Sequence, residues 1–426
     1  MTGDQSETGL PPAAGVVLAE CQPLAQRFAA AGFRLYLVGG IVRDFFAGRS
    51  TTEPDLDFTT NASPAEIKRL VAPVAEALWA QGERFGTIAA KVDGRLVEIT
   101  THRSEAYDPE SRKPRVVFAD DVLVDLSRRD FTINALAVDL TTFSPRLIDP
   151  FSGVTDLRSG LLRTPLEPSE SFSDDPLRML RAARFVARLD LRPDAGVVTA
   201  MALMAERLDV VSAERIRDEF DKLLLSPDPR GGLDLLLATG LATRFVPELS
   251  EAQVDAVSAL PPDPVVRLAA VLQVAGSSGA RQRLRSLRHS RRVIERVSSL
   301  VAAVERWRDH DGIWSDAETR TLVASTGDDA GMVVELLSQI ARQGVGESLE
   351  RSLHDLGRRE DLEDLGPPLD GESVMAELGL APGPEVGAAL RHLHHLRLAT
   401  GPLDGDAARR LLHDWWNERS GSCDPS

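Results

Sequence analysis

The segment Asp55-Leu56-Asp57-Phe58 carries two carboxylates with one apolar residue between them. Alternate side chains of a β-strand point to the same face, so a strand here places Asp55 and Asp57 side by side. Leu56 and Phe58 then turn toward a core. Two like charges held this close repel each other unless a cation lies between them. Because such oxygen ligands suit Mg²⁺, which also keeps phosphate oxygens among its ligands, the segment predicts a magnesium site.

A pair of glycines precedes this segment, in the run Leu37-Val38-Gly39-Gly40-Ile41-Val42-Arg43-Asp44. Glycine lets the backbone approach phosphate oxygens closely, and a helix that opens at Ile41 aims its N–H groups at the same anion. Alone, an Asp-x-Asp segment is typical of a solvated turn or strand edge, and a glycine pair is less specific still. The ordered combination of strand, glycines, helix and paired carboxylates predicts a two-metal site for nucleotidyl transfer.

Length and composition are those of a globular protein with two or three domains. The chain has 426 residues, of which 43% are hydrophobic. No apolar run approaches the ~20 residues that span a bilayer, and residues 1–12 do not read as a secretion signal. Cys21 and Cys423 lie near opposite ends and form no disulfide or zinc pattern. We therefore expect a cytoplasmic protein with no membrane partner.

The formal net charge of −16 would repel a nucleic acid, so any RNA binding must depend on local basic patches and metal. One candidate patch is a group of six arginines interleaved with leucines: Arg281, Arg283, Arg285, Arg288, Arg291 and Arg292. The alternative interpretation is the solvent-facing side of an amphipathic helix.

Residues from about 14 to 150 read as an α/β region. A helix over 16–31 leads into a strand over 34–38, the helix that carries Arg43, and a strand over 55–59. Ser63-Pro64-Ala65-Glu66 predicts the start of a helix that continues to about Trp79. Asp93-Gly94 is a strong hairpin signal and predicts flanking strands over 87–92 and 95–101.

Further polar residues of this region are candidates for the site. Glu98 shares one strand face with Leu96 and Thr100, which makes it a candidate third metal ligand or simply part of an exposed face. The polar stretch 102–120 reads as a long loop, a length that usually indicates function or mobility. The pair Arg128-Arg129 could grip a triphosphate in fork geometry, although such a pair is commonly a surface feature.

From Asp156 onward the pattern is helical. Asp174-Asp175-Pro176 opens a helix in which Arg178, Arg181 and Arg184 recur every three residues among apolar side chains, so some of these arginines must be partly buried and paired. A further helix over 214–225 is expected to brace the site.

With these motifs in order, the chain resembles a class II member of the tRNA nucleotidyltransferase and bacterial poly(A) polymerase family. Five segments carry the resemblance. They are Gly39–Asp44 with Asp55–Asp57, Arg128–Ala135, Asp149–Pro150 with Gly153 and Asp156–Leu157, Asp174–Arg178, and Glu214–Ile216 with Glu219 and Lys222–Leu224.

The resemblance implies an α+β fold, in which a polymerase-beta-type nucleotidyltransferase head with a mixed sheet precedes an all-helical neck, body and tail. The expected boundaries are a flexible N-terminus at 1–13, the head at 14–150, the neck with its nucleotide-template helix at 151–255, and a tRNA-binding body and tail at 256–426.

The resemblance also implies the reaction: a tRNA 3′-hydroxyl attacks the α-phosphate of CTP or ATP, CCA is added without a nucleic-acid template, and pyrophosphate is released. By position, Asp55 and Asp57 hold two Mg²⁺ ions and Glu98 completes the catalytic set. The residues implied for triphosphate or ribose are Gly39, Gly40, Arg43 and Arg129. Asp175 and Arg178 form the protein template, and Arg181 and Arg184 contact phosphate or brace Asp175.

One departure concerns the phosphohydrolase domain that many relatives carry. Gln273 and Val274 stand where its His-Asp metal pair would be, so we expect only a degenerate remnant without hydrolase activity. Three alternatives stay open: a poly(A) polymerase, an enzyme that adds only CC, and a non-catalytic RNA-binding protein. The segment after residue 360 is not basic, which disfavours a poly(A) polymerase. The loop over 103–120 is full length, which disfavours an enzyme that adds only CC. The implied catalytic residues are all present, which disfavours a non-catalytic RNA-binding protein.

Overall fold

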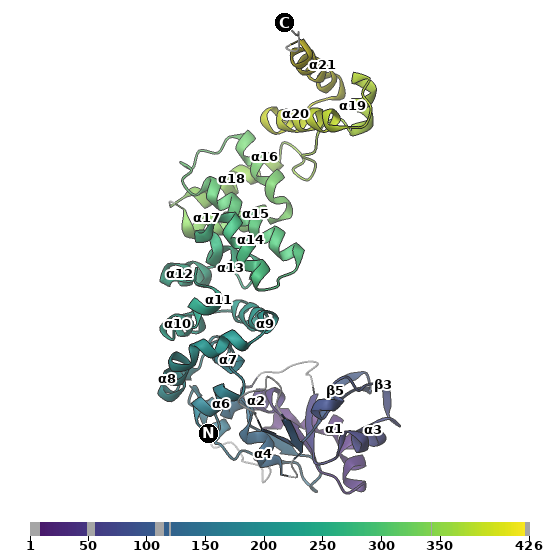
Figure 1. The fold of residues 1–426 in the computed structure, drawn as a ribbon, viewed down its shortest axis with the longest axis vertical. Helices are drawn as coiled ribbons and strands as arrows, with labels where there is room; N and C mark the ends of the chain where they lie inside the picture. The colour runs from purple at the N-terminus through teal and green to yellow at the C-terminus, as the bar shows by residue number, and fades with distance from the viewer. Residues whose placement is uncertain (1–8, 49–55, 107–114, 119–120, 342, 422–426) are drawn as a thin grey trace. The chain divides into compact units, whose positions relative to one another are not determined.

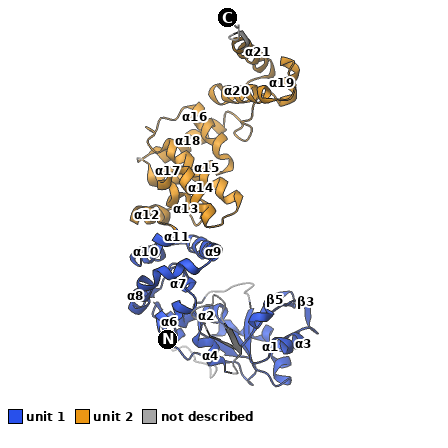
Figure 2. Ribbon diagram, viewed as in Figure 1, with its two compact units in different colours: residues 1–245 blue, residues 246–426 orange. Residues whose placement is uncertain are grey.

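The computed structural model describes residues 9–48, 56–106, 115–118, 121–341 and 343–421. The chain forms two compact units, residues 1–245 and residues 246–426 (Figure 2). The first contains the sheet and the helices that follow it, and the second is helical in its described part (Figure 1).

A seven-stranded mixed sheet forms the centre of the first unit, in the order β3-β4-β5-β2-β1-β8-β9. Strand β2 runs parallel to β5, whereas the other neighbours are antiparallel. The α+β class expected from the sequence is thereby confirmed. The strands are β1 (Leu35–Val38), β2 (Leu56–Thr60), β3 (Ala75–Trp79), β4 (Thr87–Val92), β5 (Arg95–Thr101), β8 (Ala137–Asp139) and β9 (Arg146–Ile148).

Strand β1 is buried on both faces, because its alternate side chains enter two different cores. Leu35 and Leu37 pack with Phe28 of α1 (Gly15–Ala30) and Ile67 of α3 (Pro64–Val71). On the opposite face, Val38 packs with residues of α4 (Val122–Ser127). In β2, Leu56 and Phe58 belong to the first core, so Asp57 points to the face that α4 covers only in part.

The hairpin around Asp93-Gly94 has the predicted bounds. Asp93 and Gly94 have φ angles of 50° and 78°, the left-handed conformation that a two-residue turn between twisted strands requires. Val97 and Ile99 of β5 are buried, whereas Leu96 and Glu98 are exposed, as the alternation predicted.

Two predictions in this region were wrong. The helix that begins at the Ser63 cap ends at Val71, and Ala75–Trp79 is a strand paired with β4 rather than the rest of the helix. The stretch 102–120 contains a second hairpin, in which β6 (Arg103–Ala106) pairs with β7 (Arg115–Phe118), instead of a loop throughout. Its predicted polar segment 107–114 lies outside the described residues.

Helices occupy most of the chain after β9. The predicted helical character is confirmed apart from the short parallel strands β10 (Leu161–Leu162) and β11 (Arg192–Pro193). The remaining helices of the first unit are α2 (Gly40–Phe46), α5 (Gly153–Arg158), α6 (Pro168–Asp174), α7 (Leu177–Leu189), α8 (Ala195–Met204), α9 (Ala213–Leu224), α10 (Arg230–Ala238) and α11 (Ala242–Phe245).

The second unit begins with tightly packed helices and ends with three helices around a small core of Leu369, Val374, Val386, Leu393 and Leu412. Its helices are α12 (Glu251–Ala259), α13 (Pro264–Leu272), α14 (Gly276–Ser286), α15 (Arg291–Trp307), α16 (Asp316–Thr326), α17 (Ala330–Ile340), α18 (Val345–Gly357), α19 (Gly371–Leu378), α20 (Pro384–Thr400) and α21 (Gly405–Gly421). Among the described residues, no helix is both long and apolar enough to cross a membrane.

Candidate active site

Two carboxylates of neighbouring strands lie side by side on the open face of the sheet. Asp57 of β2 and Glu98 of β5 are directly paired in the parallel register, and both side chains are exposed. Directly paired residues of adjacent strands point to the same face, so the two charges are neighbours. Asp55, the other predicted metal ligand, lies outside the described residues.

The same face opens into a cavity of about 410 Å³ to which the strands, α4, α7, α9 and the loop before η3 (Thr132–Asn134) all contribute. Five carboxylates and five arginines line it, so this part of the protein does not share the acidic excess of the whole chain. The lining residues are Val38, Asp57, Phe58, Thr87, Glu98, Thr100, Asp125, Arg128, Arg129, Asp130, Asp175, Leu177, Arg178, Arg181 and Arg215.

The glycine pair forms a tight turn against one of these arginines. Gly39 has φ +77°, a conformation that favours glycine, and a Cβ there would lie 3.0 Å from Nη1 of Arg129. A Cβ on Gly40 would lie 3.5 Å from Nη2 of Arg43. The backbone and two guanidinium groups therefore meet where β1 passes into α2.

Asp125 of α4 anchors the double arginine. Arg128 donates to Oδ1 of this carboxylate at 3.1 Å, and Arg129 donates to Oδ2 at 3.3 Å. Burial opposes ionisation of Asp125, but the two guanidinium groups outweigh it and hold its pKa below the usual value. The arginine pair that the sequence predicted to bind a triphosphate is thus held in place by the buried carboxylate of Asp125.

Asp130 connects the loop after α4 to helix α7. Its Oδ1 accepts from the Phe131 amide at 2.9 Å and from Asn134 at 3.0 Å, while its Oδ2 accepts from Nε of Arg181 at 2.8 Å. Burial raises the pKa of Asp130, but Arg181 and Asn134 lower it by more. The pKa therefore lies below its usual value, and the carboxylate stays ionised. Arg43 in turn donates to Asn134 at 2.7 Å.

The two residues implied as the nucleotide template, Asp175 and Arg178, stand at the start of α7. The Asp175 carboxylate accepts from Arg215 of α9 at 2.8 Å. Arg178 donates to the Ser171 hydroxyl at 2.9 Å and also to the backbone carbonyl of Arg128. Each side chain is held by a partner from another segment, so the donor and acceptor groups are oriented before any nucleotide binds.

Helix α9 braces α7 from behind through Glu219, which is 5% exposed. Glu219 accepts from Nε of Arg184 at 2.6 Å and lies 3.6 Å from Nη1 of Arg181. This arrangement confirms that arginines of α7 are partly buried and paired, and that the helix over 214–225 packs behind the site.

The structure brings six of the predicted site residues to the cavity wall: Asp57, Glu98, Arg129, Asp175, Arg178 and Arg181. Arg43 and Arg184 are buried and do not line it; they support Asn134 and Glu219 instead.

Sequence reasoning missed Asp125, Asp130 and Arg215. For Asp125 the available signal was local, because Arg128 and Arg129 follow it at three and four residues. Asp130 and Arg215 lie in recognised segments, and the signal there was charge pairing between segments.

The donor set of this face fits a divalent cation. Two like charges in direct cross-strand pairing repel each other, and a cation between them removes that cost. Within the described part of the chain, no cluster of three or more His, Cys, Asp or Glu residues is arranged to hold a metal. Asp57 and Glu98 therefore form a two-carboxylate set on this face of the sheet.

Comparisons with known proteins agree with this geometry. Residues 35–163 match the family described as the Poly A polymerase head domain, and residues 190–253 match the one described as the probable RNA and SrmB-binding site of polymerase A. The CCA-adding enzyme of Streptococcus gordonii is 32% identical over 397 residues, covering 91% of this chain and 94% of that one. That of Lactococcus lactis subsp. lactis is 33% identical over 384 residues, covering 87% and 91%.

Solved structures extend the similarity over nearly the whole chain. The CCA-adding enzyme of Bacillus stearothermophilus in complex with CTP matches with a TM-score of 0.77 and 26% identity, covering 97% of this chain and 100% of that one. The Thermotoga maritima CCA-adding enzyme complexed with tRNA matches in fold, with a TM-score of 0.66, 19% identity and coverage of 94% and 96%.

Proposed function

The chain belongs to the family of CCA-adding enzymes, and from that premise we propose how its residues carry out the reaction. It is a tRNA nucleotidyltransferase, in which the 3′-hydroxyl of tRNA attacks the α-phosphate of CTP or ATP and pyrophosphate leaves. One observation carries the proposed assignment of roles: a single cavity is lined by the paired carboxylates Asp57 and Glu98 and by the template residues Asp175 and Arg178.

Asp57 and Glu98, together with Asp55, would hold Mg²⁺. When bound, Mg²⁺ lowers the pKa of the attacking hydroxyl and stabilises the charge that develops on the leaving pyrophosphate. The carboxylates contribute the oxygen ligands and fix the position of the reacting groups on a rigid sheet. Magnesium is proposed because this oxygen-only set leaves room for phosphate oxygens among the ligands.

The triphosphate would lie against the turn at Gly39-Gly40, where the absence of side chains lets the backbone come close. Arg129, held by Asp125, would contact phosphate oxygens directly. Arg43 is buried and bonded to Asn134, so we assign it to holding the turn and the loop before Asn134 together.

Asp175 and Arg178 would read the base. A carboxylate accepts from the exocyclic amine of C or A, and a guanidinium donates to the adjacent ring nitrogen or carbonyl. U and G present the reverse order of donor and acceptor, which would leave charged groups unsatisfied in the cavity. Arg215 would position Asp175, and Arg181 and Arg184 would brace the helix through Asp130 and Glu219.

The helical part beyond the head would hold the tRNA, with residues 151–255 as the neck and residues 256–426 as the body and tail. Recognition there is expected to depend on helix shape and 2′-hydroxyl groups rather than on base reading. We place the reaction in the cytoplasm.

The test is addition of labelled CTP and ATP, separately and together, to a tRNA that lacks its 3′ CCA, in the presence of Mg²⁺. The proposal requires two C residues with CTP alone and a final A only when ATP is added. Long A tails without use of CTP would identify a poly(A) polymerase, and addition of CC with no A would identify the CC-adding alternative.

A further inference from the structure

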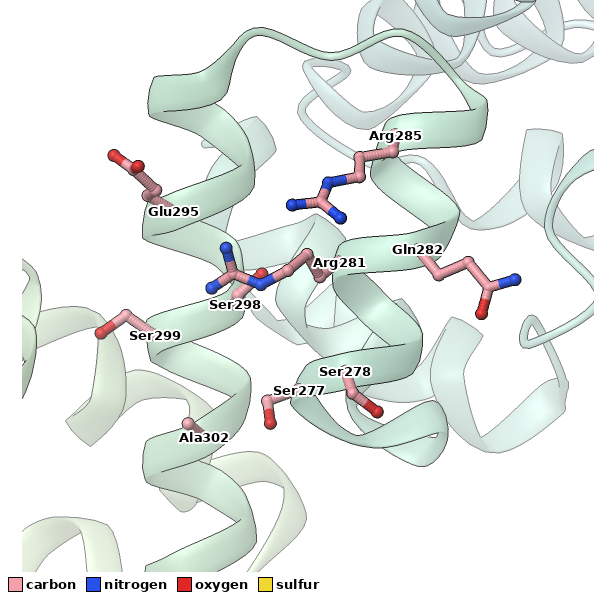
Figure 3. Close-up of a pocket in the computed structure, with 9 residues that line it drawn as sticks. All are labelled: Ser277, Ser278, Arg281, Gln282, Arg285, Glu295, Ser298, Ser299 and Ala302. Carbon is pink, nitrogen blue, oxygen red and sulfur yellow. The ribbon is translucent and has the colours of Figure 1, made fainter.

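A second charged cavity lies in the helical unit, and it shares no residue with the head site. Its volume is about 740 Å³, and it is formed between α14 and α15 (Figure 3). The lining residues are Ser277, Ser278, Arg281, Gln282, Arg285, Glu295, Ser298, Ser299 and Ala302. Two of them, Arg281 and Arg285, belong to the group of arginines that the sequence singled out.

The two arginines are one helical turn apart and face the same space. In Figure 3 both extend from α14 toward α15. Within the part of the chain that the structure describes, neither forms an ion pair or hydrogen bond with a side chain. Like charges four residues apart on a helix repel each other, so this arrangement favours an anion between them.

The one carboxylate on the rim does not neutralise them. Glu295 accepts from Nε of Arg291 at 2.7 Å, and Figure 3 shows its carboxylate turned away from Arg281. The cavity is therefore positive, although the whole chain has a formal net charge of −16. A local positive site in an otherwise acidic chain attracts an anionic ligand.

A buried hydroxyl provides independent evidence of a missing partner. Ser298 of α15 is only 3% exposed, and its Oγ has no hydrogen-bond partner among the residues that the structure describes. Ser298 and Arg281 both line the cavity, from α15 and α14 respectively (Figure 3). A buried hydroxyl without a partner is unfavourable. An anion oxygen held by Arg281 could accept a hydrogen bond from the Ser298 hydroxyl.

We propose that this cavity binds phosphate groups, through the Arg281 and Arg285 guanidinium groups and the Ser298 hydroxyl. Guanidinium forks and hydroxyl donors match tetrahedral phosphate oxygens. The volume exceeds that of one phosphate, so there is room for a ligand that carries successive phosphates. It is either the backbone of an RNA helix or a free polyphosphate such as pyrophosphate. The first source rests on the proposed tRNA function, and the second does not.

The test compares Arg281→Ala, Arg285→Ala and Ser298→Ala in the full-length protein. Arg292→Ala is the matched control, because Arg292 is an exposed arginine of the same group outside the cavity. Binding of a tRNA that lacks its CCA end is measured by fluorescence anisotropy over a series of salt concentrations. Thermal stability is measured with and without pyrophosphate.

If RNA is the ligand, each arginine variant weakens tRNA binding several-fold at moderate salt and lowers the slope of log K against log salt by about 1. Ser298→Ala weakens binding while leaving the melting temperature equal or higher, which a merely structural hydroxyl would not do. If free polyphosphate is the ligand, tRNA binding is unchanged and the stabilisation by pyrophosphate falls more in the cavity variants than in Arg292→Ala.

The proposal is overturned if the cavity variants match Arg292→Ala in both measurements. That result differs from failure of the proposed function, in which the unmodified protein itself neither binds nor extends the tRNA.

Discussion

At the scale of single residues, the head site is built from charges that hold one another in place. Asp125 fixes the double arginine, Asp130 fixes Arg181, and Arg215 fixes Asp175. Such charge-assisted hydrogen bonds orient each group before a ligand binds, which reduces the ordering that binding requires. The specificity of the site therefore depends as much on these supporting charges as on the groups that face the nucleotide.

Replacing Arg178 with alanine is expected to relax base choice. The variant removes the proposed hydrogen-bond donor to the base, so the ratio of kcat/KM for CTP to that for UTP should fall by about 10- to 100-fold. Steady-state incorporation into a tRNA lacking CCA measures it. Unchanged discrimination would assign Arg178 to the structural bonds that it makes with Ser171 and the Arg128 carbonyl.

Arg215→Ala tests positioning of the template carboxylate. Asp175 remains present but loses its partner, so discrimination should fall less than in the Arg178 variant, with KM changing little and kcat falling. Arg217→Ala on the same helix, where Arg217 pairs with Asp218, is the control. Equal effects of the two substitutions would argue against a special role for Arg215.

At the scale of secondary structure, sequence reasoning succeeded where one local signal determined the outcome. Asp93-Gly94 gave the bounds of β4 and β5 because both residues adopt the left-handed conformation that the turn needs. It failed at Ala75–Trp79, since alanine, glutamate and leucine favour helices and only pairing with β4 makes this segment a strand. The paired carboxylate Glu98 was found by strand alternation. Asp130 was missed because its ion-pair partner, Arg181, is distant in sequence, whereas the partners of Asp125 are only three and four residues away.

Glu219→Gln is expected to destabilise the packing of α7 on α9. Arg184 would be left buried with a weaker partner, and loss of one member of a buried pair costs about 3 kcal/mol. Glu214→Gln, an exposed position of the same helix, should change the free energy of unfolding by less than about 0.5 kcal/mol. Chemical denaturation of the two variants measures the difference, and equal stabilities would contradict the buried-pair interpretation.

Asp221 of α9 should make stability depend on pH. Burial raises the pKa of its carboxyl to about 7 from its usual value of 3.8. The folded state therefore binds a proton that the unfolded state releases, and this stabilisation is lost as pH rises from about 4 to 7. Asp221→Asn should be more stable than the unmodified protein at pH 8, by about 4 kcal/mol, and equal to it near pH 4. A pH-independent difference would contradict this assignment.

At the scale of the whole molecule, the proposed catalytic site lies in the first unit, and no catalytic site is proposed for the second. In the second unit α13 ends at Leu272, and Gln273 and Val274 lie in a short 3₁₀ turn. Val274 is 54% exposed and has no ligand atom, and the Gln273 amide accepts from Arg308 at 2.6 Å. The sequence thus indicated the absence of the His-Asp pair, but not the cavity between α14 and α15, which requires two helices to be packed together.

The full-length protein is expected to show no phosphohydrolase activity. A valine cannot replace a metal ligand, so hydrolysis of cyclic phosphates and phosphomonoesters with Mg²⁺ or Ni²⁺ should not exceed that of buffer. Metal-dependent hydrolysis that persists in an Asp57→Asn variant would show a second catalytic centre and contradict the prediction.

The central claim is that the paired carboxylates of β2 and β5 are catalytic rather than structural. Its most direct test is the rate of CTP incorporation into a tRNA lacking CCA by Asp57→Asn and Glu98→Gln, each with its melting temperature. Glu76→Gln, on β3 outside the cavity, serves as the control. We predict rates at least about 100-fold below that of the unmodified protein, with melting temperatures equal or higher because a charge repulsion is removed. Rates within a few-fold of the control would contradict the account.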